Sequence, residues 1–174
     1  MEFSNFQEDL DALPSINTVN YLPVEKSYLK VLIIGTLIMG TIFSVVITFL
    51  YFKIDDEEMR WLPYFLAGLF SLIFLLSLIA SIQGFKRIGY ALRQRDIIYK
   101  KGWIWRSKTV IPFNRIQHSE VNQNPIERIF GLAKLKVFTA GGSSSDLSIP
   151  GLTPKRAEQL KFYISNKAGL DEEE

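Results

Sequence analysis

The chain has 174 residues, of which 48% are hydrophobic, and a formal net charge of +2 at pH 7. This length suits one domain of ordinary size, or a small domain with an appendage. There is one histidine and no cysteine, which removes the ligands of a typical zinc site, so we expect neither a metal site nor a cofactor. The absence of cysteine also fits a reducing compartment.

Residues 1–29 form an acidic N-terminal segment, with five acids against one lysine. That is the reverse of the basic start of a signal peptide, so we do not expect the next apolar stretch to be cleaved. Apolar residues recur at helical spacing in this segment: Phe3, Phe6, Leu10 and Leu13. They suggest either docking onto a basic surface or disorder, and we favour disorder because chain termini usually fray.

Two uncharged apolar stretches of 22 residues each follow, at residues 31–52 and 61–82. A helix of that length is about 33 Å long, and the hydrocarbon core of a bilayer is about 30 Å thick. The core helix of a soluble protein rarely stays uncharged for so long. We therefore expect a transmembrane hairpin over residues 30–83, closed by the charged loop at residues 53–60.

Basic residues near the spans indicate the orientation of the hairpin. The closing loop carries Lys53 and Arg60. Six basic residues lie close to the other ends of the spans: Lys26, Lys30, Lys86, Arg87, Arg93 and Arg95. Because basic flanks stay in the cytoplasm, this imbalance predicts that both termini are cytoplasmic.

The spans contain no ionisable residue, which argues against an ion pathway or proton relay in the bilayer. Small residues recur in them at helical spacing: Thr36, Gly40, Ser44, Thr48, Ala67, Ser71, Ser77 and Ser81. Such stripes let helices approach closely. We favour packing of the hairpin against itself, with a face for homo-oligomers as the alternative.

The composition changes after the second span. Residues 83–170 contain sixteen Lys and Arg against five acids, a local balance of +11, and an acidic tail follows at residues 170–174. Nucleic acid and anionic lipid are the usual partners of so basic a domain. We expect no nucleic acid, because no recognised nucleic-acid motif is present and the membrane tether makes lipid the nearer target.

Short runs rich in β-branched and aromatic residues predict a β domain at residues 84–169. Thr153 and Pro154 can begin a final helix with Ala157, Leu160 and Ile164 on one face and Gly169 at its end. Strands are expected at residues 96–105, 106–113, 115–123, 133–140 and 146–151, with one helical turn at 124–131. The pattern favours a small, open β-barrel with the helix over one end.

The loop GGSSSD, residues 141–146, lies between two predicted strands and is interpreted as a turn. A phosphate-binding loop would need a lysine before a helix, and a nucleophile elbow would need Gly-x-Ser-x-Gly. A triad could be drawn from Ser143, His118 and Asp146. We expect no catalytic residues, because His118 lies on a predicted strand and no oriented base activates a nucleophile.

Trp103 and Trp105 flank a turn in KKGWIWRSK, residues 100–108. Tryptophan beside Lys and Arg is a combination that anchors proteins at a bilayer surface. The alternative is that one tryptophan packs in the domain while the other is partly exposed, and the sequence leaves both open.

Residues 114–152, NRIQHSEVNQNPIERIFGLAKLKVFTAGGSSSDLSIPGL, resemble the signature of bacterial pleckstrin-homology (PH) proteins of the YdbS-like type. In that family an R-I-Q-H-V strand leads into a P-L-x-R-x-x-G-L turn, followed by T-A-G-G and I-P-G-L. The residues that match are Arg115, Ile116, Gln117, His118, Pro125, Arg128, Gly131, Leu132, Thr139, Ala140, Gly141, Gly142, Pro150, Gly151 and Leu152. Ser119 and Ile126 depart from it conservatively, and the resemblance covers residues 86–168.

The resemblance implies two near-orthogonal antiparallel sheets with a capping helix, in a multi-pass protein of the bacterial plasma membrane. The fold class expected is therefore α+β: a two-helix transmembrane hairpin followed by a PH-like β-barrel capped by a C-terminal helix. Arg115 and Arg128 are expected to hold the strand–turn segment together through carbonyls or acids such as Glu127. His118 is expected to be structural.

The resemblance implies that the protein acts as the partner of a larger, multi-domain membrane protein of the same type, because members of this family often look like such partners. We therefore expect a non-enzymatic interaction or assembly module that binds a second such protein, with binding of anionic lipid head groups in the inner leaflet as the alternative. The residues expected to contact lipid or a partner are Lys86, Arg87, Arg93, Arg95, Lys100, Lys101, Trp103, Trp105, Arg106 and Lys108.

Overall fold

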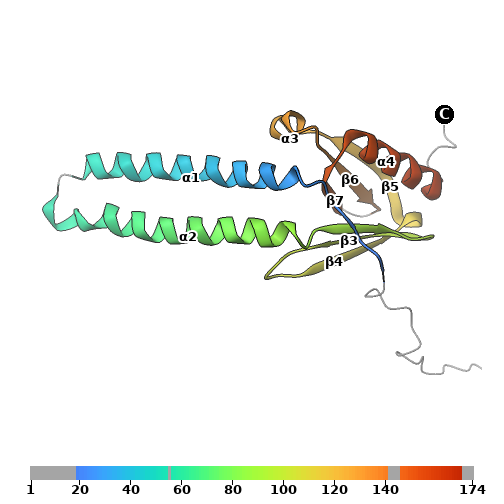
Figure 1. The fold of residues 1–174 in the computed structure, drawn as a ribbon, viewed down its shortest axis with the longest axis horizontal. Coiled ribbons are helices and arrows are strands. Elements are labelled where there is room, and N and C mark those ends of the chain that lie inside the picture. Colours follow the sequence, from blue (N-terminus) through green and yellow to red (C-terminus); the bar gives the residue numbers. More distant parts are fainter. Residues whose placement is uncertain (1–18, 55, 141–145, 170–174) are drawn as a thin grey trace, which may run out of the picture.

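The computed structural model describes residues 19–54, 56–140 and 146–169. Two long antiparallel helices project from one end of a small domain of strands and short helices (Figure 1). Helix α1 spans Tyr28–Lys53 and helix α2 spans Trp61–Phe85, with the short helix η3, Glu57–Met59, between them. The spans expected at residues 31–52 and 61–82 lie inside these helices.

Apolar side chains on both helices are exposed, among them Phe52 and Tyr64. Both helices are long and apolar enough to cross a membrane, and almost none of their most apolar windows is buried in the protein. A water-soluble protein does not expose apolar surface of this extent, so we infer that hydrocarbon covers it. The expected membrane hairpin is therefore present.

Small residues bring α1 and α2 together, as expected if the hairpin packs against itself. Gly40 is buried, and a Cβ atom there would lie 2.5 Å from Cε2 of Phe74. The hydroxyls of Thr36 and Ser81 lie 3.3 Å apart and bridge the two helices. Aromatic stacking of Phe43 on Phe70, with centroids 5.8 Å apart, adds to the contact.

The domain contains two antiparallel sheets. The first has the order β1-β2-β3-β4 and the second β5-β6-β7. The strands of the first are β1 (Leu22–Pro23), β2 (Gly89–Leu92), β3 (Asp96–Lys101) and β4 (Ser107–Pro112); those of the second are β5 (Ile116–Asn122), β6 (Ala133–Thr139) and β7 (Leu147–Leu152). The short helix η4, Phe113–Arg115, links the sheets. The two antiparallel sheets that the resemblance implies are therefore present, and among the described strands no ladder joins them into a closed barrel.

The C-terminal helix α4, Pro154–Ala168, completes the core. The Thr153 hydroxyl accepts a hydrogen bond from Arg156 N at 3.2 Å, and Gly169 ends the helix in the left-handed conformation. Its predicted apolar face, which includes Leu160 and Ile164, is buried with Leu135 and Ile149 of the second sheet. Capping residues and apolar spacing therefore predicted this helix correctly.

Helix α3, Pro125–Ile129, is the predicted helical turn. It begins with a capping box, in which the Glu127 carboxylate accepts a hydrogen bond from Asn124 N at 3.0 Å. Gly131 follows it with a φ of 64°. The segment N-P-x-E therefore carried enough local information to place this short helix.

The first sheet contains two strands, β1 and β2, that were not predicted from the sequence. Leu22 pairs with Tyr90, and Pro23 with Gly89. Part of the segment assigned to residues 1–29 is therefore a strand of the domain, and α1 begins at Tyr28. A two-residue strand is too short to show alternation, and proline is tolerated there because β1 lies at a sheet edge. The spacing of Phe3 to Leu13 lies outside the described residues.

Candidate functional site

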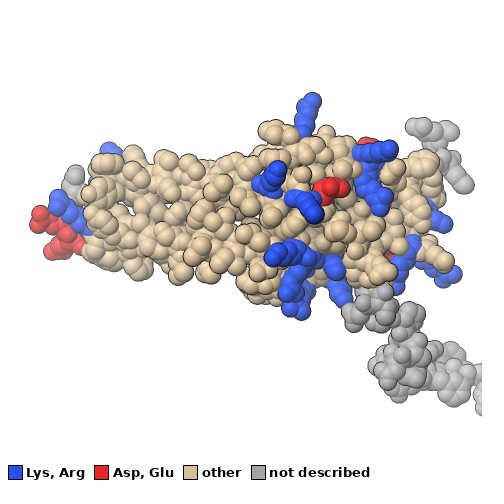
Figure 2. Space-filling view, in the orientation of Figure 1, with Lys and Arg blue, Asp and Glu red and all other residues tan. Residues whose placement is uncertain are grey.

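Charged residues divide the molecule along its length (Figure 2). The middle of the hairpin is uncharged, and Lys and Arg gather where the hairpin meets the domain. Exposed Lys86 and Arg87 directly follow α2, and exposed Lys30 lies in the first turn of α1. This pattern is that of a membrane-spanning segment with its basic flank on the domain side.

The loop between β3 and β4 is directed toward the base of the hairpin (Figure 1). Gly102 makes its tight turn possible, because φ is 97° and a Cβ atom would lie 1.7 Å from Trp105 O. Trp105 is 87% exposed and Ile104 66% exposed, whereas Trp103 is half-buried. One tryptophan therefore packs and the other is exposed, and the exposed one belongs to the loop that is directed toward the hairpin base.

Helix α3 lies on the other side of the hairpin base, beside the start of α1 (Figure 1). Its last residue, Ile129, is 79% exposed. Ile104 and Trp105 on one side and Ile129 on the other thus form two exposed apolar groups, which we call the apolar tips. They flank the hairpin where it enters the domain.

Strand geometry separates two of the lysines that the sequence grouped together. Alternation along β3 places Lys101 on the face of Ile97 and Tyr99, which belong to the core, and Lys100 on the opposite face. The Lys100 ammonium lies 4.1 Å from the centroid of the Tyr21 ring. Lys100 also stands opposite Lys108 in the β3–β4 ladder. The expected contact residues therefore do not form one continuous patch.

Arg93 is paired with Asp96, although its side chain remains 35% exposed. Its Nε donates to Asp96 Oδ1 at 2.7 Å and a terminal nitrogen donates to Oδ2 at 2.6 Å. This hydrogen bonding raises the pKa of Arg93 above its ordinary value. Arg95 and Arg106 are exposed. Of the arginines expected at a contact surface, Arg93 therefore has a structural role.

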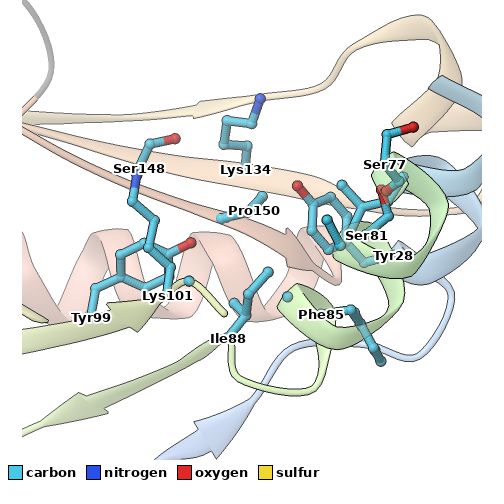
Figure 3. Close-up of a pocket in the computed structure, with 14 residues that line it drawn as sticks. Tyr28, Ser77, Ser81, Phe85, Ile88, Tyr99, Lys101, Lys134, Ser148 and Pro150 are labelled. Carbon is cyan, nitrogen blue, oxygen red and sulfur yellow. The ribbon is translucent and has the colours of Figure 1, made fainter. Parts of the chain in front are cut away.

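A cavity of about 650 Å³ lies between the base of the hairpin and the domain. The hydroxyl of Tyr28 points into it from α1, and that of Tyr99 points into it from β3 (Figure 3). Burial, and secondly the neighbouring Tyr28, raises the pKa of Tyr99, so its hydroxyl stays protonated at neutral pH. Lys101 and Lys134 also line the cavity.

Sequence reasoning missed this cavity, although it named Lys101. Tyr99 ends a short apolar run and Tyr28 stands three residues before the first uncharged stretch, and neither position distinguishes a cavity residue from a core aromatic. Lys134 and Ser148 come from neighbouring strands of the second sheet, far from Tyr28 in the chain. Alternation along β3 could have placed Lys101 beside Tyr99; the other partners depend on how the sheets meet the helices.

Glu127 is the buried acid of the domain, 3% exposed. Its carboxylate lies 3.6 Å from the Lys134 ammonium. The expectation that Arg115 or Arg128 binds this acid is wrong: both arginines are exposed, and neither side chain bonds to another described residue. Lys134 lies at the start of β6, which follows α3 closely in the chain, and it reaches Glu127 there, whereas both arginines are exposed.

His118 and Asp146 have other partners than a catalytic triad would require. The His118 ring stacks on Phe138 with centroids 4.2 Å apart, and its Nε2 lies 3.8 Å from Glu120 Oε1. Asp146 Oδ2 accepts hydrogen bonds from the amide and hydroxyl of Thr139 at 2.8 and 2.6 Å. Ser143, Gly141 and Gly142 lie outside the described residues. Within residues 19–54, 56–140 and 146–169, no group of three His, Asp or Glu residues could hold a metal ion.

The remaining residues of the shared motif have structural positions. Pro125 is the first residue of α3 and Gln117 occupies a bulge in β5. Pro150 and Gly151 lie in β7. Gly151 has a φ of 69° and packs against Tyr28, where it also accepts a hydrogen bond from Glu25 N at 2.8 Å. This motif therefore joins the second sheet to the hairpin.

A family model for the bacterial PH domain matches residues 28–168. The chain belongs to the bacterial PH-domain family. Bacillus subtilis (strain 168) has two similar proteins of this kind. UPF0699 transmembrane protein YdbS is 24% identical over 151 residues, which cover 84% of this chain and 88% of YdbS. UPF0699 transmembrane protein YdbT is also 24% identical, over 78% of this chain but 29% of its own longer sequence.

No solved structure matches this bacterial PH-domain protein. The family model begins at Tyr28 and so includes the hairpin as well as the sheets. The motif that first suggested the family is thus confirmed, and the names of both relatives describe transmembrane proteins.

Proposed function

We propose that the protein is a non-enzymatic binding module of the bacterial plasma membrane whose PH-like domain lies against the anionic inner leaflet. The observation that carries this proposal is the position of the apolar tips. Ile104 and Trp105, in the β3–β4 loop, and Ile129, the last residue of α3, are exposed, and both segments lie beside the base of the hairpin (Figure 1). Apolar and aromatic side chains beside basic residues are the groups that enter a bilayer surface.

Electrostatics supports the same placement. Lys86, Arg87 and Arg106 are exposed and lie next to the hairpin base or the β3–β4 loop. Each basic residue near an anionic leaflet contributes about 1 kcal/mol of attraction, and the hairpin tether raises the effective concentration of the domain at that surface. Of the two functions considered from the sequence, this geometry favours the lipid surface over the partner protein.

Trp105 provides the test. In a full-length variant with Trp61→Phe and Trp103→Phe, Trp105 is the remaining tryptophan. After reconstitution into nanodiscs, lipids brominated near the head group should quench its fluorescence, more strongly when part of the lipid is anionic and less strongly at high salt. Fluorescence that brominated lipid leaves unchanged would show that the domain stands away from the bilayer.

Two single variants sharpen this experiment. Ile129→Ser removes the second apolar tip and should weaken the quenching of Trp105, because the two tips hold the domain down together. Phe162→Ser is the matched control: Phe162 is 66% exposed but lies on α4. Helix α4 is on the side of the domain away from the hairpin (Figure 1), so this change should leave the quenching intact.

Orientation is testable because the chain lacks cysteine. We propose that both termini are cytoplasmic. A single cysteine at Asp56, in the loop between α1 and α2, should react with a membrane-impermeant maleimide in spheroplasts. A cysteine at Lys167, at the end of α4, should react only after lysis. The reverse pattern would place the domain outside the cell.

Assembly with a second membrane protein is the alternative, and Phe162 favours it. The bilayer cannot cover this residue, so a protein surface is the apolar cover available to it. YdbT is a longer protein with a related segment, which makes a relative of that size a suitable partner. Purification of the full chain from its host in mild detergent should recover a stoichiometric membrane protein, and Phe162→Ser should lose it. A solitary monomer would contradict this alternative.

A further inference from the structure

The cavity between the hairpin and the domain has two chemically different walls. Leu32, Phe85 and Ile88 line it from the helices and the segment after α2, and present apolar side chains. The opposite wall carries hydroxyls and ammonium groups, including those of Tyr99, Lys101 and Ser148 (Figure 3). Its volume, about 650 Å³, lies within the usual range of ligand sites. The ligand should therefore be amphipathic.

The charge of this wall suits one anionic group. Two lysines and no acid line the cavity among the described residues. Lys134 is partly neutralised by Glu127 at 3.6 Å, whereas the Lys101 ammonium forms no ion pair with a described residue. Lys101, Lys134 and Glu127 together carry one net positive charge, which matches the single negative charge of a phosphodiester. Neutral tyrosine and serine hydroxyls can donate further hydrogen bonds to its oxygens.

An apolar groove continues the cavity along the hairpin. It has a volume of about 470 Å³ and runs between α1 and α2 past Gly35, Met39 and Phe74. Leu32, Ser77 and Ser81 line both hollows, so the two adjoin each other. The groove lies within the membrane span, where an acyl chain is the available occupant.

The position of the cavity across the membrane agrees with such a lipid. Tyr28 is the first residue of α1 and Phe85 the last of α2, so the cavity lies where the spans leave the hydrocarbon and reach the head groups. Basic pockets at the cytoplasmic ends of membrane helices are typical sites for anionic lipid head groups. A free phosphate compound would share the polar wall but would leave the groove unused.

We propose that this cavity binds one anionic glycerophospholipid, with its phosphate at Lys101 and the tyrosine hydroxyls and an acyl chain in the groove beside Gly35. The inference deepens the docking on the inner leaflet and rests on it, since it names a specific lipid site beneath the domain. The site differs from the apolar tips, which contact the surface without selecting a single molecule.

The test compares adjacent lysines in the full-length protein. Protein reconstituted with phosphatidylglycerol and phosphatidylcholine is released into the gas phase, and native mass spectrometry counts the retained lipids. One phosphatidylglycerol should be retained, and Lys101→Gln should weaken its binding about tenfold, the effect of one lost charge-assisted hydrogen bond. Lys100→Gln removes the same charge from the opposite face of β3 and should have little effect. Equal effects of the two changes would overturn the site.

A second pair of variants tests the groove. A Cβ atom at Gly35 meets nothing within 4 Å, so Gly35→Leu should fold and fill the groove, reducing retained phosphatidylglycerol. Gly68 is equally open and lines neither hollow, so Gly68→Leu is the control. Retention unchanged by Gly35→Leu would contradict an acyl chain in the groove.

Two further outcomes separate the possible failures. If soluble glycerol phosphate competes with phosphatidylglycerol at comparable concentration, the ligand is a free phosphate compound and the lipid proposal is wrong. If no lipid is retained while brominated lipid still quenches Trp105, the surface docking stands and the specific site fails. Loss of both signals would overturn the docking itself.

Discussion

Gly151 packs directly against Tyr28 and so joins the last strand of the domain to the first residue of the membrane hairpin. A Cβ atom on Gly151 would lie 2.7 Å from both Cβ and Cγ of Tyr28. Beside this contact, Glu25 N donates to Gly151 O at 2.8 Å. The hairpin and the PH-like domain are therefore connected by close packing as well as by the chain that links α2 to β2.

Gly151→Ala should destabilise the protein more than the matched change Gly131→Ala. Both glycines have positive φ, 69° and 64°, so each alanine costs about 1–2 kcal/mol of backbone strain. At Gly131 the added methyl group meets nothing within 4 Å, whereas at Gly151 it collides with Tyr28. Thermal unfolding in detergent measures the difference, and equal losses would show that the Tyr28 contact is soft.

The sequence predicted the elements whose signals are local. Thr153, Pro154 and Gly169 marked both ends of α4, and the uncharged runs marked the two spans. The strand expected at residues 133–140 is present as β6, in which alternation leaves Leu135 and Val137 buried on one face. Each of these signals lies within a few residues of the element that it specifies, which is why a single sequence is enough to find it.

Contacts between distant segments could not be predicted in the same way. Strand β1 exists because Leu22 meets Tyr90, and the cavity exists because Tyr28 meets the ends of β3 and β7. No periodicity connects such positions. The sequence grouped the basic residues as one contact surface, but their division between two faces of β3 follows from strand alternation, which separates Lys100 from Lys101.

A disulfide should form between cysteines at positions 36 and 81 in an otherwise cysteine-free chain. The hydroxyls of Thr36 and Ser81 lie 3.3 Å apart, so sulfur atoms in their places have only a short approach to make to reach the S–S length of about 2.05 Å. Oxidation of Thr36→Cys/Ser81→Cys in membranes should give an internally cross-linked monomer of increased electrophoretic mobility. Thr41→Cys/Ser81→Cys is the control, because residue 41 lies five residues further along α1 and faces elsewhere. Cross-linked dimers in place of monomers would favour a homo-oligomer.

Asp146 should stabilise the β6–β7 connection in a pH-dependent way. Hydrogen bonds from the side chain and then the amide of Thr139 hold its pKa below the ordinary value of 3.8. A carboxyl with a lowered pKa in the folded state stabilises the fold above its unfolded pKa, and this stabilisation disappears as pH falls through the folded value. The stability difference between wild type and Asp146→Asn should therefore be constant near neutral pH and shrink below about pH 4. Thr139→Val keeps the amide donor and should give an intermediate difference; a difference that does not change with pH would contradict this assignment.

Lys134 should stabilise the folded protein chiefly because it is the counter-ion of the buried Glu127. Glu127 is 3% exposed and its carboxylate has two partners, Asn124 N at 3.0 Å and the Lys134 ammonium at 3.6 Å. Lys134→Met leaves the carboxylate without its counter-ion, which for fully buried pairs costs about 3–5 kcal/mol. The Lys134 side chain is 24% exposed, so water offsets part of that cost and we expect about 1–3 kcal/mol.

Glu127→Gln distinguishes charge from packing in the same site. Glutamine keeps an oxygen that can accept from Asn124 N, so it preserves the capping box while removing the buried charge. In the double variant Glu127→Gln/Lys134→Met no charge remains unpaired, and much of the stability lost in Lys134→Met should return. Chemical unfolding of the four proteins in detergent gives the coupling energy. Additive losses would mean that Lys134 and Glu127 do not interact, and that the cavity wall keeps the full charge of both lysines.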